Sequence, residues 1–93
     1  MNLTAADFDR IARRIRHDKN SHWRDLGGDL DQGKIWIDPQ GNWYSWTGGG
    51  RISHLFYAGE LWEKTIRTSR TTPDKVTVKQ VKPTEFDLEK CKW

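Results

Sequence analysis

The sequence predicts an α+β domain in which an N-terminal amphipathic helix packs on a four- to five-stranded antiparallel sheet. Three patterns indicate this fold: a capped, helically periodic segment at about 5–19, a strand–turn–strand pattern at 34–47, and further strand-like segments at about 52–82. Because 93 residues can form one modest core, we expect a single domain over residues 1–93. Residues 20–33 then form a connector and residues 83–93 a tail.

The predicted helix begins with a capping sequence. Thr4 can cap the free backbone amides, Asp7 can complete a capping box, and Leu3 can contact Phe8. One side of the helix is apolar and carries Phe8, Ile11, Ala12 and Ile15. The opposite side carries Arg10, Arg13, Arg14 and His17. These arginines are either a solvated surface or a phosphate-contacting one, and both interpretations remain open.

The connector at 20–33 is polar, and we expect Trp23 and Leu26 to anchor it. Its Asp29-x-Asp31 spacing occurs in calcium loops, but the late bidentate glutamate of those loops is absent. The sequence therefore predicts no metal site in this segment.

Residues 34–47 have the β-branched and aromatic character of a hairpin. The segment Asp38-Pro39-Gln40-Gly41 predicts a type I turn whose glycine takes the left-handed conformation of a G1 bulge. Such a turn places Ile37 opposite Trp43 and Trp36 opposite Tyr44. One face then carries Ile35, Ile37, Trp43 and Ser45, and the other carries Lys34, Trp36, Tyr44 and Trp46. We expect the helix to cover the first face and to leave the second partly exposed.

The glycine run Gly48–Gly50 predicts a flexible joint, since its spacing matches no nucleotide-binding loop. From residue 52 onward the pattern is ambiguous, because residues 52–63 also fit a helical stripe. We favour strands, with a turn at Ala58–Glu60 and a second hairpin turn at Thr71–Asp74. Phe86 and Leu88 indicate a short final strand or a pinned tail. The expected core consists of Phe8, Ile11, Ile15, Ile35, Ile37, Trp43, Leu55, Trp62, Ile66, Val76 and Val78.

Composition narrows the class of protein. Sixteen basic and thirteen acidic residues give a net charge of +3, which permits an anionic partner without requiring one. The lone cysteine, Cys91, excludes an internal disulfide, and we interpret it as a surface thiol. No apolar run has the length of a membrane span, and the N-terminus does not resemble a signal peptide. We therefore expect a soluble, cytoplasmic protein with no membrane partner.

Catalytic chemistry is sparse in this sequence. The histidines are His17, His22 and His54, and no hydrolase-type serine motif or metal-ligand spacing accompanies them. A small nuclease could be assembled from Arg51, His54 and Glu60, but no pattern requires it. The sequence therefore predicts a non-enzymatic protein without a cofactor.

The aromatic content is the strongest functional signal. Six tryptophans can all fill a core that is poor in leucine, isoleucine and valine, or some can form a binding surface. We expect Trp36, Tyr44 and Trp46 to form a platform that stacks bases, while basic side chains hold phosphates. The basic side chains are Lys34, Arg10, Arg13, Arg14, Arg67, Arg70 and Lys79.

The sequence thus favours a small basic module that binds nucleic acid, single-stranded in preference. The same aromatic and basic residue types also form hot spots for protein partners. The alternative is therefore an accessory protein of a phage or mobile element, which inhibits or adapts a larger host protein such as a nucleic-acid enzyme or a defence complex. No motif in the chain identifies a family.

Overall fold

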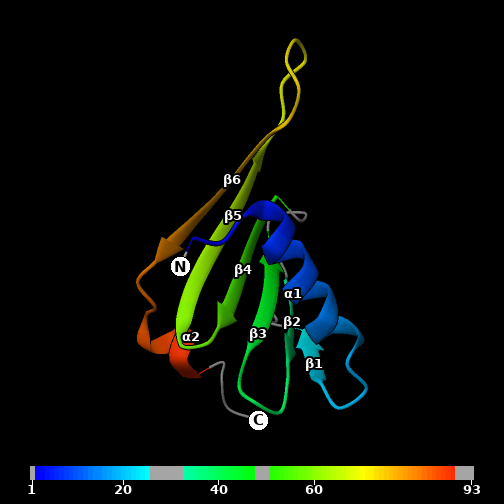
Figure 1. Cartoon of the computed structure of the whole chain (residues 1–93), viewed down its shortest axis with the longest axis vertical. Coiled ribbons are helices and arrows are strands. Elements are labelled where there is room, and N and C mark those ends of the chain that lie inside the picture. Colours follow the sequence, from blue (N-terminus) through cyan, green and yellow to red (C-terminus); the bar gives the residue numbers. More distant parts are fainter. Residues whose placement is uncertain (1, 26–32, 48–50, 90–93) are drawn as a thin grey trace.

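The computed structural model describes residues 2–25, 33–47 and 51–89. The elements in chain order are α1 (Ala5–His17), β1 (His22–Asp25), β2 (Lys34–Ile37), β3 (Trp43–Thr47), β4 (Ile52–Tyr57), β5 (Glu60–Arg67), β6 (Lys75–Val81) and α2 (Glu85–Glu89). Within the described residues, six strands form one antiparallel sheet in the order β1–β2–β3–β4–β5–β6 (Figure 1). The α+β class is confirmed, and the sheet has more strands than predicted because β1 lies in the segment interpreted as a connector.

Some predictions fall outside the described residues. These concern the anchor Leu26, the Asp29-x-Asp31 spacing, the glycine run Gly48–Gly50 and the thiol of Cys91.

The start of α1 agrees with its capping sequence. The backbone amide of Asp7 donates to the Thr4 hydroxyl, at 3.1 Å, and the amide of Thr4 donates to the Asp7 carboxylate, at 3.3 Å. The helix ends at His17, two residues earlier than predicted, because Asp18 has an extended backbone. Its buried residues are the predicted stripe, Phe8, Ile11, Ala12 and Ile15.

The predicted β2–β3 register is confirmed at every position. Ile37 pairs with Trp43, and Trp36 pairs with Tyr44. In the turn the amide of Gly41 donates to the Asp38 carbonyl, at 3.0 Å, and Gly41 has φ +86°. This left-handed conformation is the one that the G1 bulge requires of its glycine.

The ambiguous segment 52–63 forms strands, and its helical alternative is wrong. Ala58 and Gly59 form a two-residue turn with φ of 52° and 81°, which brings β4 and β5 together as neighbours. The next connection is longer than the predicted Thr71–Asp74 turn, since residues 68–74 all lie between β5 and β6. The tail forms the short helix α2 rather than a strand, and Thr84 and Asp87 repeat the capping box of α1.

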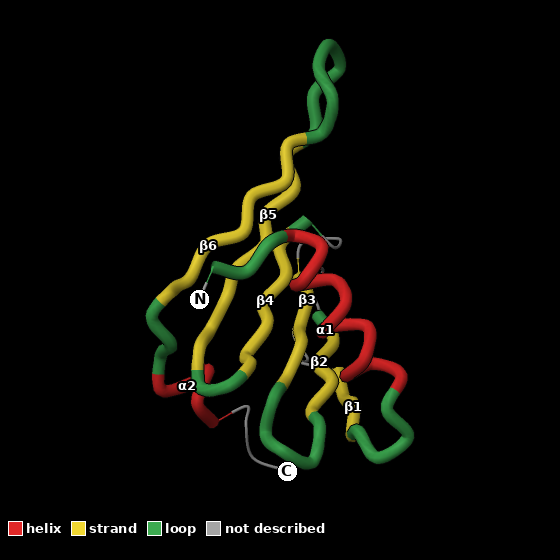
Figure 2. Tube along the Cα trace, in the orientation of Figure 1, coloured by secondary structure: helices red, strands yellow, loops and turns green. Residues whose placement is uncertain are grey.

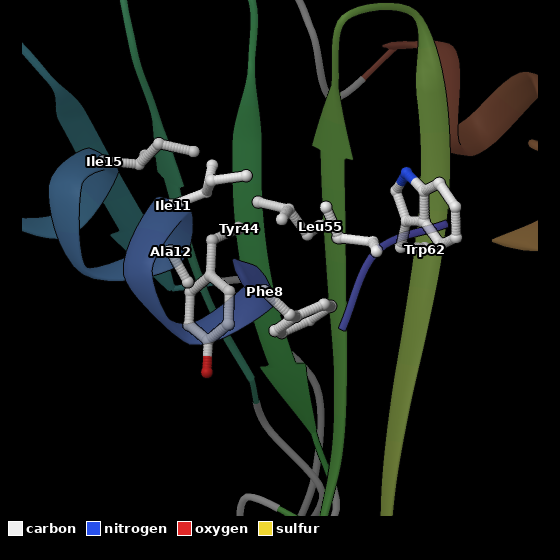
Figure 3. Close-up of a cluster of buried hydrophobic side chains, with 8 residues drawn as sticks. Phe8, Ile11, Ala12, Ile15, Tyr44, Leu55 and Trp62 are labelled. Carbon is white, nitrogen blue, oxygen red and sulfur yellow. The ribbon is translucent and has the colours of Figure 1, made fainter. Parts of the chain in front are cut away.

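The helix lies on the opposite face of the sheet from the one expected. It lies across β2 and β3, and we call the face of the sheet that it covers the helix face. The buried sheet residues on this face are Tyr44, Leu55 and Trp62 (Figures 1 and 3). Trp36 and Trp46 are half-buried against the same cluster. The opposite face, which the helix was expected to cover, is called the far face. It carries a second buried cluster of Ile35, Ile37, Trp43 and Leu61.

Both hairpin faces are therefore buried, which explains the wrong assignment. Each face carries an apolar row across neighbouring strands, so side-chain alternation alone does not choose between them. On the helix face, Trp36 and Trp46 are partly buried against the cluster that contains the apolar residues of α1. The Lys64 side chain adds an ion pair with Asp9 of α1. Three expected core residues are less buried than predicted, because Ile66 and Val78 are half-buried and Val76 is 45% exposed.

The β5–β6 hairpin extends beyond the rest of the sheet. The last pair that β4 makes with β5 is Ile52 with Thr65, whereas β5 and β6 continue to Arg67 and Lys75. We call residues 66–76 the arm. Figures 1 and 2 show the arm projecting along the longest axis of the molecule.

Candidate nucleic-acid interface

The predicted aromatic platform is largely covered. Trp36 and Tyr44 do lie together, with ring centres 5.8 Å apart, on the face that was predicted for them. Phe8 of α1 packs edge-on against the Tyr44 ring at 6.1 Å, and Tyr44 is only 9% exposed (Figure 3). Its hydroxyl lies 3.4 Å from that of Ser53. A base cannot stack on Tyr44 while α1 is in place, so the platform is not the open surface that was expected.

Aromatic and cationic side chains do meet where the helix ends, at the β1 edge. Trp23 is 53% exposed and pairs across the strands with Trp36. The ammonium of Lys34 lies 5.5 Å from the Trp23 ring centre, and the Arg16 guanidinium lies 5.0 Å from that of Tyr44. Both distances are within cation–π range. We call Arg16, Trp23, Lys34 and Trp36 the edge cluster.

Two members of the edge cluster were not among the predicted site residues. Arg16 flanks the apolar stripe of α1, and a helical projection could have placed it beside the sheet. The sequence predicts Trp23 as an anchor of the connector, but Trp23 belongs to a strand whose four residues are all exposed. Its contact with Lys34 depends on the β1–β2 pairing, which no local pattern indicates.

The predicted arginines of α1 are on its solvent side. Arg10, Arg13 and Arg14 are all exposed. Arg10 approaches Asp7 at 3.5 Å, and the Arg14 guanidinium lies 5.7 Å from the centre of the Tyr57 ring. These contacts lie along the surface and leave the guanidinium groups accessible to an anion.

Asp7 keeps a negative charge next to Arg10. Hydrogen bonds from the Thr4 side chain and backbone, followed by the nearby Arg10, lower the pKa of Asp7 below its ordinary value of 3.8. Asp7 is therefore ionised at neutral pH and partly offsets the positive charge at the start of α1. The stretch from Arg13 to His17 has no acidic residue.

The arm presents a second, separate basic surface. Arg67 and Lys75 are direct cross-strand partners, as are Thr65 and Thr77 in the next row of the same face. A groove of about 420 Å³ lies here on the far face and is lined by Ile52, Glu63, Thr65, Arg67, Lys75, Thr77 and Lys79. The groove thus combines three cations and two hydroxyl groups with one carboxylate.

The one carboxylate of the groove is already shared. Glu63 contacts the His54 ring nitrogen at 3.3 Å, accepts a hydrogen bond from Thr65 at 3.4 Å, and lies 3.9 Å from Lys79. Among the described residues, neither Arg67 nor Lys75 forms an ion pair. Like charges placed directly opposite each other on a sheet are destabilising, so this pair favours an anion between or above its members.

The structure therefore distributes the predicted basic residues over separate surfaces. Lys34 belongs to the edge cluster, and Arg10, Arg13 and Arg14 lie on the solvent side of α1. Arg67 and Lys79 lie on the far face of β5 and β6. Arg70 is exposed in the loop at the end of the arm, not in a strand as predicted. Lys75 was missed, because its pairing with Arg67 depends on a seven-residue connection whose shape the sequence does not specify.

The nuclease arrangement considered from the sequence is not assembled. His54 pairs with Glu63 on the far face, and the strand register places Glu60 on the helix face. In the part of the chain that the structure describes, no group of three or more His, Cys, Asp or Glu side chains could hold a metal ion. Over the same residues, no helix has the length and apolar character that crossing a membrane requires. In comparisons with known proteins, no family model, curated protein or solved structure matches this chain.

Proposed function

We propose that this protein is a non-enzymatic, cytoplasmic module that binds nucleic acid. The observation that carries the proposal is the cross-strand pair Arg67–Lys75, which forms no ion pair with any described residue. It lies beside Lys79 in a groove that also holds two threonine hydroxyls. Cations and hydroxyl groups in this arrangement suit phosphate oxygens, to which most protein–nucleic acid hydrogen bonds are made. The α1 arginines add further exposed cations, and the edge cluster adds cations next to aromatic rings.

The structure changes which nucleic acid we favour. A preference for single strands followed from an open aromatic platform, on which bases could stack. Because α1 covers Tyr44 and half-buries Trp36 and Trp46, that reason is weakened. Phosphate contact by the arm then becomes the main source of affinity.

The proposal is tested by a titration with labelled oligonucleotides at two salt concentrations. If Arg67, Lys75 and Lys79 each neutralise one phosphate of B-form DNA, the slope of log affinity against log salt is about −2.7. Affinity then falls by about 40-fold when salt rises from about 50 to 200 mM. Binding that is absent at low salt, to single strands and duplexes alike, would refute the proposal.

Charge-matched variants show whether the arm is responsible. Arg67→Glu should abolish most of the binding, since it replaces a phosphate-attracting group with a repelling one. Lys82→Glu makes the same change of net charge just after β6, away from the arm, and should have a much smaller effect. The same oligonucleotides should remain uncleaved when common divalent metals are present, as a non-enzymatic role requires.

A protein partner is the second candidate function. It is favoured by Trp23, a large aromatic side chain that is 53% exposed beside Lys34. Tryptophan and arginine are typical of binding hot spots. Here the protein would be a phage or mobile-element accessory protein that inhibits or adapts a larger host protein. Capture of a partner that survives nuclease treatment, and that Trp23→Ala abolishes while Arg67→Glu does not, would favour this candidate over the first.

A further inference from the structure

We propose that the arm enters the major groove of double-stranded DNA. The inference rests on the proposed function and adds the class of nucleic acid and the manner of contact. It starts from the shape of the arm. Beyond the Ile52–Thr65 pair, β5 and β6 continue for two more residue pairs, Ile66–Val76 and Arg67–Lys75. The loop 68–74 joins them, and the arm projects from the body (Figure 2).

The dimensions of a two-stranded ribbon match the groove. Neighbouring strands lie about 4.8 Å apart, so the ribbon with its side chains is roughly 10 Å wide. The major groove of B-form DNA is about 12 Å wide and admits such a ribbon, whereas the minor groove of an undistorted duplex, about 6 Å wide, is too narrow for it. The major groove of an A-form RNA duplex is deep and narrow, which excludes the arm in the same way.

The chemistry of the arm suits the walls and the floor of that groove. Within residues 66–76 there are three cations and one acidic residue, Asp74. Arg67 and Lys75 lie at the base of the loop, where the phosphate walls would be, and Arg70 lies within the loop itself. An arginine at this position can reach guanine O6 and N7, the commonest specific contact in the major groove.

Apart from Pro73, the remaining loop side chains are small and polar. Four of them carry hydroxyl groups, namely Thr68, Ser69, Thr71 and Thr72. The Thr71 amide donates to the Ser69 hydroxyl at 3.3 Å, and the two hydroxyls are 3.4 Å apart, which shapes the loop next to Arg70. Hydroxyl groups can form hydrogen bonds with phosphates, and with donors or acceptors on the base edges. A tip of this composition is a poor match for an apolar protein surface or a membrane.

The test compares a DNA duplex of about 20 base pairs with its single strand and with an RNA duplex of the same sequence. The wild-type protein should bind the DNA duplex best. Arg70→Ala should lower duplex affinity by roughly 5- to 150-fold, the range for an arginine that contacts a base, and should change single-strand affinity far less. Lys82→Ala, the control, removes the same charge outside the arm and should have little effect.

A second variant addresses the arm as a whole. Replacing residues 68–74 with Asn-Gly closes the Arg67–Lys75 pair with a favoured two-residue turn and removes the tip. Its duplex affinity should fall to that of Arg70→Ala or below, with a melting temperature that shows an intact fold. Because Arg70 is exposed in a loop, Arg70→Ala gives the same information if the shortened variant does not fold.

Methylation protection with dimethyl sulfate then identifies the groove. Insertion as proposed protects guanine N7, which faces the major groove, and leaves adenine N3 in the minor groove reactive. Protection of adenine N3 alone, equal loss in Arg70→Ala and Lys82→Ala, or equal affinity for the RNA duplex would overturn the insertion while leaving nucleic-acid binding in place. A wild-type protein that binds no nucleic acid refutes the proposed function itself.

Discussion

Arg67→Glu should stabilise the free protein while it weakens binding to nucleic acid. In the structure Arg67 faces Lys75 across the ribbon, with no ion pair to either side chain among the described residues. The substitution converts a repulsive cross-strand pair into an attractive one. Opposite charges in this position stabilise by roughly 0.2–1 kcal/mol, which corresponds to about 1–8 °C in melting temperature for a domain of this size.

The assay is a thermal melt of wild type, Arg67→Glu and Lys82→Glu at low salt and at about 1 M salt, where the Debye length is about 3 Å. The gain in Arg67→Glu should shrink at high salt, because the interaction is an exposed charge pair. Lys82→Glu controls for the change in net charge and should shift the melting temperature less. A lower melting temperature for Arg67→Glu at low salt, with Lys82→Glu unchanged, would show that Arg67 stabilises the arm and would refute the reasoning about an unsatisfied cationic pair.

The remaining predictions concern the fold. Thr4→Ala removes the hydroxyl that accepts from the Asp7 amide and should cost about 1 kcal/mol in the free energy of unfolding, measured by chemical denaturation; an unchanged midpoint would mean that the cap contributes nothing. Trp43→Ala empties a fully buried position and should cost roughly 3–5 kcal/mol, whereas Trp23→Ala, at an exposed edge, should cost far less, and equal losses would contradict the burial pattern. Because the folded-state pKa of Asp7 is lowered, its contribution to stability is present above pH 3.8 and is lost as pH falls through the lowered pKa. Asp7→Asn should therefore flatten the acid limb of the stability–pH curve, and an unaltered limb would assign it to other carboxyl groups.

Local chemistry accounts for the parts of the fold that the sequence predicted. The α1 start depends on Thr4 and Asp7, three residues apart, and the β2–β3 register depends on the four-residue Asp38–Gly41 turn. In both cases the residues that determine the geometry are neighbours in the chain. The same reasoning could have predicted α2, since Thr84 and Asp87 have the spacing of Thr4 and Asp7.

The features that the sequence did not predict depend on contacts between residues that are far apart in the chain. The choice of face for α1 depends on two apolar rows of similar character, one through Tyr44 and one through Trp43. Strand β1 has no buried side chain, so its pairing with β2 leaves no alternation in the sequence. The site follows the same division, because burial of Tyr44 and the opposition of Arg67 and Lys75 are both consequences of tertiary structure. The sequence therefore indicated which basic residues could bind an anion, but not which of them lie together in the structure.

The salt dependence of duplex binding tests the central claim most directly. The slope of log affinity against log salt should be about −2.7 for the wild-type protein, if Arg67, Lys75 and Lys79 each neutralise one phosphate. The double variant Arg67→Ala/Lys75→Ala should reduce its magnitude by about 1.8, since two phosphate contacts are lost. An unchanged slope in the double variant, or no binding by the wild type at low salt, would contradict the account.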